Sequence, residues 1–182
     1  LRQYLFELGV DSKDEDLVRD TIKEIKESVY FGERSPLYKY CAASAILWEV
    51  NRHMQEKKGA PMSQEDQQSL AEARKLVDEG ISARGEWGAL WRVRGEIDHL
   101  EDNLAGAIEN YQRSMEFSRT GQSATARRLV HLLYLANRLE EAKEAMKYMG
   151  NTDAADPFTR KLAGDVASKT GDADTAIAMA IK

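Results

Sequence analysis

Apolar residues recur along this chain every three or four positions, the spacing of one face of an α-helix. Between Gly88 and Ile181 the same helical phrase occurs three times, and its central alanines, Ala107, Ala142 and Ala176, are separated by 35 and then 34 residues. The positions twelve residues before these alanines hold the small or slender residues Gly95, Val130 and Gly164. A period of about 34 residues with two helices in each copy is typical of stacked helix pairs.

The residues before Gly88 also predict helices. Apolar residues from Leu1 to Leu8 indicate a short first helix that Gly9 should end, and Ser12-Lys-Asp-Glu15 is read as a capping box that opens a second helix. We expect that second helix to carry Leu17, Thr21, Ile25, Ser28 and Val29 on its apolar face and to stop near Gly32. No alternation typical of a strand occurs.

Three further start signals follow, and the last of them is Asp156-Pro157, which should cap the last helix pair. Ser35-Pro36 should begin a helix that reaches about His53 or Lys57, and Ser63 should cap the next one. Ala73 lies 34 residues before Ala107, which matches the alanine position of an earlier copy. Residues 1–86 are therefore expected to form divergent helix pairs that continue or cap the array.

The repeated phrase resembles the tetratricopeptide repeat family. Its pattern is matched by Trp91, Gly95, Ala107 and Tyr111 in the first copy, by Leu129, Leu133, Ala142 and Met146 in the second, and by Ala163, Gly164, Ala167, Ala176 and Ala180 in the third. The first copy departs from the pattern because Arg94 and Asp98 stand where Leu and Tyr are usual, and Arg119 stands in place of Pro. The resemblance implies an all-α solenoid of antiparallel helix pairs, with about ten helices in all. Three degenerate repeats would cover about 88–121, 122–156 and 157–182, the last of them truncated.

Composition limits the range of partners. A net charge of -5 and a pI near 5.4 disfavour nucleic acid. RNA binding by the related 35-residue helical repeats is disfavoured too, because the basic residues do not recur at one position in every copy. The longest apolar run, Cys41 to Trp48, is too short to cross a bilayer, so this segment should not insert into a membrane. Cys41 is the single cysteine and is predicted to be a packed thiol.

Residue patterns for catalysis are missing from the sequence. No glycine-rich phosphate loop occurs, and His53, His99 and His131 have no partner at metal-ligand spacing. No cysteine or serine is combined with a histidine and an acid in a way that predicts a nucleophile. We therefore expect no enzymatic activity, no cofactor and no metal.

The resemblance also implies a binding surface, because first helices line the concave face in this family. Residues expected there are Arg92, Glu96 and His99 from the first copy, Arg127, Arg128, His131 and Tyr134 from the second, and Lys161 and Asp165 from the third. The row of cations would suit an acidic peptide or a terminal carboxylate. Alternatively, Arg92 with Glu96, and Lys161 with Asp165, form ordinary ion pairs along one helix.

The second copy is expected to leave positive charge uncompensated at Arg127, Arg128, His131 and Arg138, and Tyr134 is expected to be exposed. The sequence thus predicts a non-catalytic scaffold that presents a groove to a protein or peptide. The alternative is a regulatory or spacer domain of a larger enzyme or membrane-associated protein, with contacts inside its own chain. Because the chain starts at Leu1 and stops within a helix of its third copy, it is also expected to be a piece of a longer protein.

Overall fold

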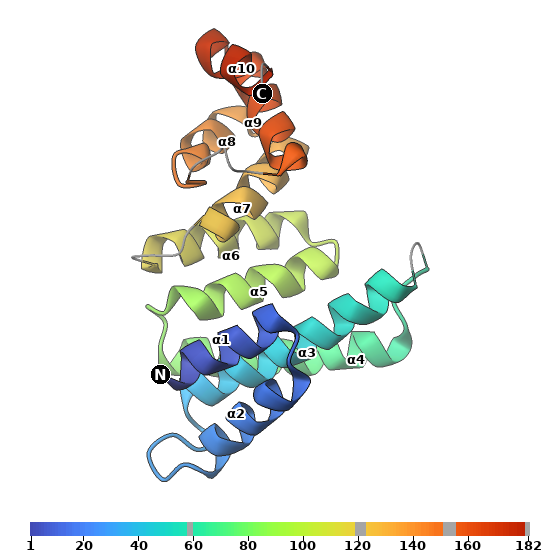
Figure 1. Ribbon diagram of the computed structural model, residues 1–182, viewed down its shortest axis with the longest axis vertical. Coiled ribbons are helices and arrows are strands. Elements are labelled where there is room, and N and C mark those ends of the chain that lie inside the picture. The colour runs from blue at the N-terminus through green and yellow to red at the C-terminus, as the bar shows by residue number, and fades with distance from the viewer. Residues whose placement is uncertain (58–59, 119–122, 151–155, 181–182) are drawn as a thin grey trace.

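The computed structural model describes residues 1–57, 60–118, 123–150 and 156–180, and these residues form ten helices and no strand. The helices are α1 (Arg2–Ser12), α2 (Glu15–Glu27), α3 (Pro36–Glu56), α4 (Gln64–Ala83), α5 (Gly88–Leu100), α6 (Leu104–Phe117), α7 (Ser123–Leu135), α8 (Leu139–Met146), α9 (Pro157–Lys169) and α10 (Ala173–Ala180). Consecutive helices form antiparallel pairs that stack along the long axis of the molecule (Figure 1). The prediction of an all-α solenoid of helix pairs is confirmed.

Two sets of contacts hold the stack together. The second helix of one pair packs on the first helix of the next, as α4 does on α5, α6 on α7 and α8 on α9. First helices also pack on each other, as α1 does on α3, α3 on α5 and α7 on α9. The first helices thus pack from α1 to α5 and from α7 to α9, and an ion pair between Arg128 and Glu96 links α7 to α5. Stacking of this kind is the geometry of a solenoid.

Several helices begin where the sequence predicts. Ser35 accepts a hydrogen bond from the amide of Tyr38 at 3.1 Å, and Ser63 accepts one from Asp66 at 3.1 Å. Asp156 does the same for Thr159 at 3.1 Å. Each side chain satisfies a donor in the first turn that has no partner within the helix.

The boundary between α1 and α2 differs from the prediction. α1 continues through Gly9, and Lys13, with φ 58°, adopts the left-handed conformation that follows it. Gly9 is buried, and its lack of a side chain gives room to α2. A Cβ at this position would lie 3.0 Å from Cγ2 of Val18. Asp14 caps α2 by accepting from the Leu17 amide at 2.9 Å, whereas the Ser12 hydroxyl donates to the Leu8 carbonyl. The predicted capping box at Ser12 is wrong.

The end of α2 also differs. The helix stops at Glu27, and Val29 lies beyond it with 97% of its surface exposed. Val18, Thr21 and Ile25 are its buried residues. The prediction that α2 reaches Gly32 with Val29 on its apolar face is therefore wrong. The predicted departure at Arg119 lies outside the described residues.

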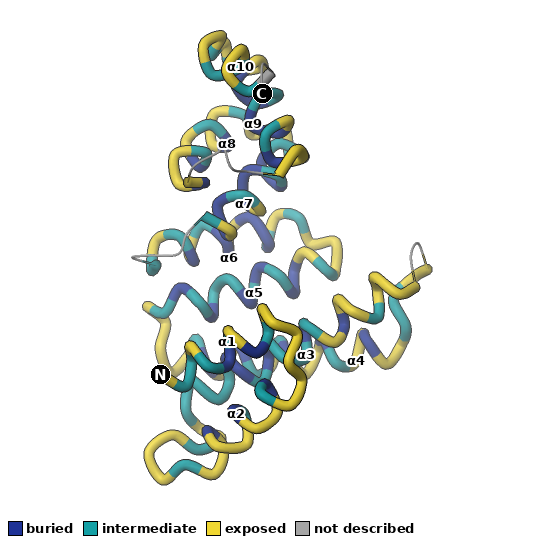
Figure 2. Tube along the Cα trace, viewed as in Figure 1, coloured by how far each residue is buried: buried dark blue, intermediate teal, exposed yellow. Residues whose placement is uncertain are grey.

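The buried apolar side chains form two clusters. Figure 2 shows where the buried residues lie along the backbone. The first extends from Phe6 on α1 to Ile97 on α5, and the second from Ala107 on α6 to Val166 on α9. The boundary between them lies within the α5/α6 pair. The division between residues 86 and 87 stays a prediction from the sequence pattern. The apolar cluster of the N-terminal part extends past it into α5.

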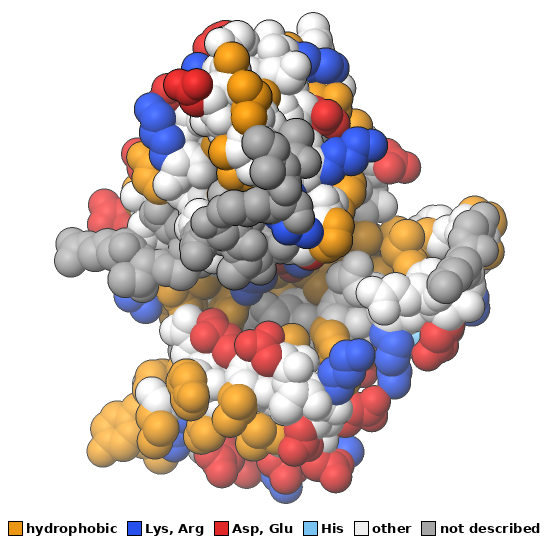
Figure 3. Space-filling model, turned by 45° about the horizontal axis from the view of Figure 1, so that its top comes forward, with side chains coloured by type: hydrophobic (Ala, Val, Ile, Leu, Met, Phe, Trp, Pro, Cys, Tyr) orange, Lys and Arg blue, Asp and Glu red, His pale blue; other side chains and the backbone are white. Residues whose placement is uncertain are grey.

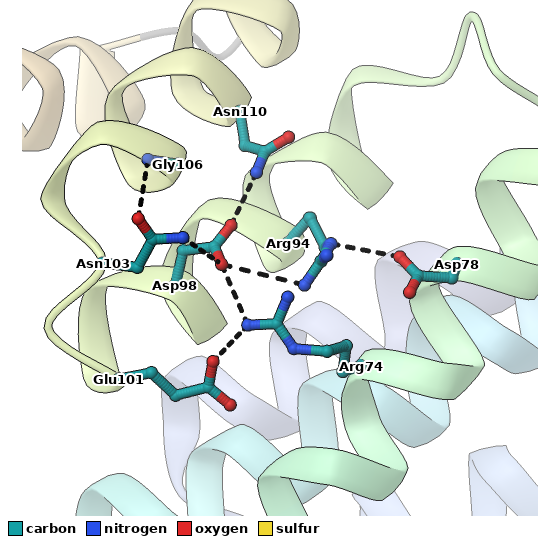
Figure 4. A network of polar contacts seen from close by, with 8 residues as sticks. All are labelled: Arg74, Asp78, Arg94, Asp98, Glu101, Asn103, Gly106 and Asn110. Carbon is teal, nitrogen blue, oxygen red and sulfur yellow. Dashed lines mark hydrogen bonds and ion pairs between the residues drawn. The ribbon is translucent and has the colours of Figure 1, made fainter.

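A polar network explains the two departures from the family pattern in α5. Asp98 is 2% exposed, and its carboxylate accepts hydrogen bonds from Arg74 on α4 at 2.9 Å and from Asn110 on α6 at 2.6 Å (Figure 4). Arg94 pairs with Asp78 at 3.1 Å and lies 3.8 Å from Asp98. Charged side chains thus replace the usual Leu and Tyr in joining α5 to its neighbours.

Candidate functional site

The first helices of the first four pairs enclose a cavity of about 410 Å³, which we call the first-helix groove. It is lined by Phe6, Glu7, Val10 and Asp11 of α1, by Tyr40, Ser44, Leu47, Trp48 and Asn51 of α3, by Arg92 and Glu96 of α5, and by Ala124, Thr125 and Arg128 of α7. In the space-filling view the molecule is hollowed between its N-terminal and C-terminal parts (Figure 3). The groove is the place where four separate pairs contribute to one surface.

A chain of hydrogen bonds crosses the groove. The Tyr40 hydroxyl donates to Glu7 at 2.9 Å and accepts from Nη2 of Arg92 at 3.2 Å. Nη1 of Arg92 donates to Glu96 at 2.7 Å, and Arg128 donates to the same Glu96 oxygen. Side chains of α1, α3, α5 and α7 are thereby fixed relative to one another.

Burial and a neighbouring carboxylate keep Arg92, Arg128 and Tyr40 of this hydrogen-bond network protonated. The negative charge of Glu96 raises the pKa of Arg92 and of Arg128, so both guanidiniums stay charged. Burial raises the pKa of Tyr40 well above its usual range, so its hydroxyl stays protonated and donates to Glu7. The network therefore holds charged side chains at fixed positions across the groove.

A smaller cavity of about 210 Å³ adjoins the groove and shares Glu96, Arg128 and Asn51 with it. His99 and Tyr111 complete its polar lining. The Tyr111 hydroxyl is buried and makes no hydrogen bond of good geometry within the described chain, and burial raises its pKa to about 12. Burial and the charge of Arg128 lower the pKa of His99, which favours its neutral form.

Four of the nine residues predicted for the concave face come together here. Arg92, Glu96 and Arg128 line the first-helix groove, and His99 lines the adjoining cavity. The Arg92–Glu96 ion pair along one helix, the alternative interpretation of these residues, is confirmed at 2.7 Å. Arg128 pairs with Glu96, and Arg138 pairs with Glu141 at 2.6 Å. The expectation that Arg128 and Arg138 carry uncompensated charge is therefore wrong.

The other five predicted residues lie elsewhere. Lys161 and Asp165 line a separate cavity of about 450 Å³ between α9 and α10, and no ion pair joins them in the described structure. Nε of Arg127 is buried without a hydrogen-bond partner in the same described set. These three residues do not extend the groove.

His131 and Tyr134 are occupied by neighbouring side chains. The His131 ring meets the Phe158 ring edge-on with centroids 5.2 Å apart, and the Lys169 ammonium lies 4.5 Å from the centre of the Tyr134 ring. Tyr134 is half-buried against the second cluster. The expectation that it is exposed is wrong.

Sequence reasoning missed the contribution of α1 and α3, which provides Glu7, Asp11, Tyr40 and Trp48. Both helices lie within residues 1–86, which were treated as a continuation or cap of the array. The available signal was the alanine register, because a helix pair that matches Ala73 also has a first helix that should face the groove.

The described residues offer neither a metal-ligand cluster nor a membrane-spanning helix. Among them, no group of three or more His, Cys, Asp or Glu side chains is arranged to hold a metal ion. Within the same residues, every helix falls short of the length or the hydropathy that a bilayer crossing needs.

The stacked helix pairs and the groove lined by four first helices define a solenoid of helix pairs, similar in fold to tetratricopeptide repeats. The solved structure of PilF from Pseudomonas aeruginosa, a tetratricopeptide repeat protein, is similar with a TM-score of 0.56, and the match covers 99% of this chain and 89% of that chain at 15% sequence identity. At this identity the likeness concerns the fold. No protein-family model matches the sequence, and no curated protein matches it either.

Proposed function

We propose that this chain is a non-catalytic interaction module that binds a segment of another protein in the first-helix groove. The observation that carries the proposal is the groove itself, a cavity of about 410 Å³ to which four first helices contribute. A segment lying there contacts four helix pairs at once. The solenoid fold supports a protein partner in general terms.

The lining suits a polypeptide. Partly exposed apolar side chains such as Val10 and Trp48 line the groove together with the charged groups Glu7, Arg92 and Arg128. A peptide offers both side-chain types, together with main-chain donors and acceptors. The net charge of -5 disfavours a nucleic-acid backbone in the same place.

Arg128 stays our proposed contact for the acidic ligand that the sequence predicts. Its side chain is 51% exposed, so a carboxylate of the partner can reach it. That carboxylate would share the guanidinium with Glu96, which makes the contact weaker than one with an unpaired arginine. Arg127 does not line the groove and gives this proposal no support.

A groove-filling substitution tests the proposal. Ala124 is exposed on α7 and lines the groove, whereas Ala71 is exposed on α4 and lies outside it. We expect Ala124→Trp to weaken binding of peptides selected from a random displayed library by about tenfold or more, because the indole occupies their place. Ala71→Trp, the matched control, should leave binding unchanged.

Both variants are first compared with the wild-type chain by circular dichroism and thermal unfolding. Peptides that bind the two variants equally well would show that the groove is not the binding surface. Selection of no peptide by the wild-type chain would contradict the proposal as well.

A further inference from the structure

The α1 wall of the first-helix groove carries two carboxylates that no cation neutralises within the described chain. Glu7 and Asp11 lie one helical turn apart and both line the groove. Glu7 accepts hydrogen bonds from the Tyr40 hydroxyl at 2.9 Å and from Gln3 Nε2 at 3.0 Å, and both donors are neutral. The Asp11 side chain is exposed and has no ion pair or hydrogen bond among the described residues. Like charges at this spacing destabilise a helix.

The cations of the groove pair with a carboxylate of the opposite wall, and Arg92 is linked to Glu7 only through the Tyr40 hydroxyl. Arg92 and Arg128 both donate to the single carboxylate of Glu96. Three carboxylates and two guanidiniums line the groove in total, so its net charge is negative. The positive charge is concentrated between α5 and α7, and the unneutralised negative charge lies on α1.

The surface next to these carboxylates is apolar. Val10, Leu47 and Trp48 line the same cavity. The hydroxyl oxygen of Ser44 is buried there without a hydrogen-bond partner in the described structure. In Figure 3, acidic side chains lie along the N-terminal rim of the hollow.

The acidic and apolar groups beside α1 together favour a ligand side chain with one apolar part and one cationic part. A lysine or arginine side chain has an apolar stem and a charged end that only donates hydrogen bonds. Its stem fits against the partly exposed Val10 and Trp48, and its charged end fits the acceptors of Glu7 and Asp11. An acidic side chain in the same place would face two like charges, which disfavours it.

We propose that the first-helix groove recognises a basic segment of its partner, with a lysine or arginine whose charged end lies between Glu7 and Asp11. The inference rests on the proposed function of the groove and adds the chemistry of the bound segment. It places the specificity on α1, in the part of the chain where the sequence pattern of the repeats is weakest.

The test compares peptide pools selected from one random displayed library. The wild-type chain should enrich peptides with a lysine or arginine at a common position. In the double variant Glu7→Gln and Asp11→Asn, we expect this enrichment to disappear, and a selected peptide should bind about tenfold more weakly because two charge contacts are lost. Both substitutions keep the shape of the side chain, and the amide oxygen introduced by Glu7→Gln still offers the Tyr40 hydroxyl an acceptor.

Two further variants separate specificity from general damage. Asp11→Lys reverses one charge on an exposed residue and should shift the selected pool toward Asp and Glu. Glu116→Gln removes an exposed acid of α6 that does not line the groove, and it should leave the lysine and arginine enrichment intact. Replacing the enriched lysine of the peptide by glutamine should lower its affinity for the wild-type chain but not for the double variant.

The outcomes distinguish the two proposals. If Ala124→Trp blocks the selected peptides but these peptides show no excess of Lys and Arg, the basic-segment inference is overturned. The proposed function of the groove then still stands. The same holds if the double variant retains the full enrichment. If no peptide binding depends on the groove, both proposals are overturned.

Discussion

The guanidinium of Arg74 on α4 donates a hydrogen bond of 2.9 Å to the buried carboxylate of Asp98 on α5. Asn110 of α6 donates to the same carboxylate at 2.6 Å, so one acid joins three consecutive helices (Figure 4). Removing one partner of a buried ion pair leaves the other charge without compensation. We expect Asp98→Ala to lower the free energy of unfolding by about 3 kcal/mol, measured by urea denaturation.

The control for Asp98 is Glu109, an exposed acid whose Oε1 lies 3.3 Å from Arg113 on the same helix. Glu109→Ala should change the free energy of unfolding by less than about 0.5 kcal/mol, because exposed ion pairs contribute little. Equal effects of the two substitutions would contradict a structural role for the Asp98 network.

Gly95 tests the close contact of α5 with α6. A Cβ at this position would lie 3.0 Å from the ring of Tyr111, which is fully buried. Gly95→Ala should lower the free energy of unfolding by about 1–3 kcal/mol, because the buried ring must shift to admit the methyl group. At Gly85 the nearest atom to a new Cβ is 3.5 Å away, so Gly85→Ala should leave the free energy of unfolding nearly unchanged. Thermal unfolding of both variants provides the measurement.

Asp66 should make stability depend on acid pH. Its carboxylate accepts from Ser63 and lies 2.8 Å from Nδ1 of His53, and these hydrogen bonds, that of His53 first, hold the pKa of Asp66 below its usual range. A depressed pKa in the folded state stabilises the protein at higher pH, and this contribution is lost as the pH falls through that pKa. Asp66→Asn should therefore lower the melting temperature at neutral pH by about 2–4 °C.

The difference between wild type and Asp66→Asn should shrink below about pH 4, where the carboxylate begins to protonate. Melting curves recorded across this range provide the measurement. A difference that stays constant with pH would show that the ionised form of Asp66 contributes nothing.

Cys41 offers a chemical probe of unfolding around α3. Its side chain is fully buried, and burial raises the pKa of the thiol to about 12. At mildly alkaline pH this shift lowers the thiolate fraction by roughly a thousandfold, so a disulfide reagent should react slowly with the native chain. The reaction should accelerate with urea in parallel with the loss of helical circular dichroism. Fast reaction in the native state would contradict the packing of α3.

Local signals in the sequence predicted those helix starts that depend on one side chain. Ser35, Ser63 and Asp156 cap their helices because the acceptor and the amide lie within the same turn. The prediction at Gly9 was wrong because the surroundings of Gly9 are set by another helix. Gly9 gives room to Val18 of α2, a contact that no local pattern reveals.

The candidate site was predicted only in part. Arg92 and Glu96 lie on a first helix and line the groove, as the repeat period predicts, and their role in binding stays a prediction. Glu7 and Tyr40 escaped prediction since α1 and α3 depart from the repeat pattern, and their link at 2.9 Å depends on the stacking of whole helix pairs. The period predicts which helices face the groove, whereas the pairing of charges across it requires coordinates.

The position of the groove relative to the two apolar clusters has a consequence for cooperativity. α1, α3 and α5 belong to the first cluster, and α7 belongs to the second. A partner lying in the groove touches both, so its binding energy is lost when either half unfolds. A bound partner should therefore couple the unfolding of the two halves, so that they melt together.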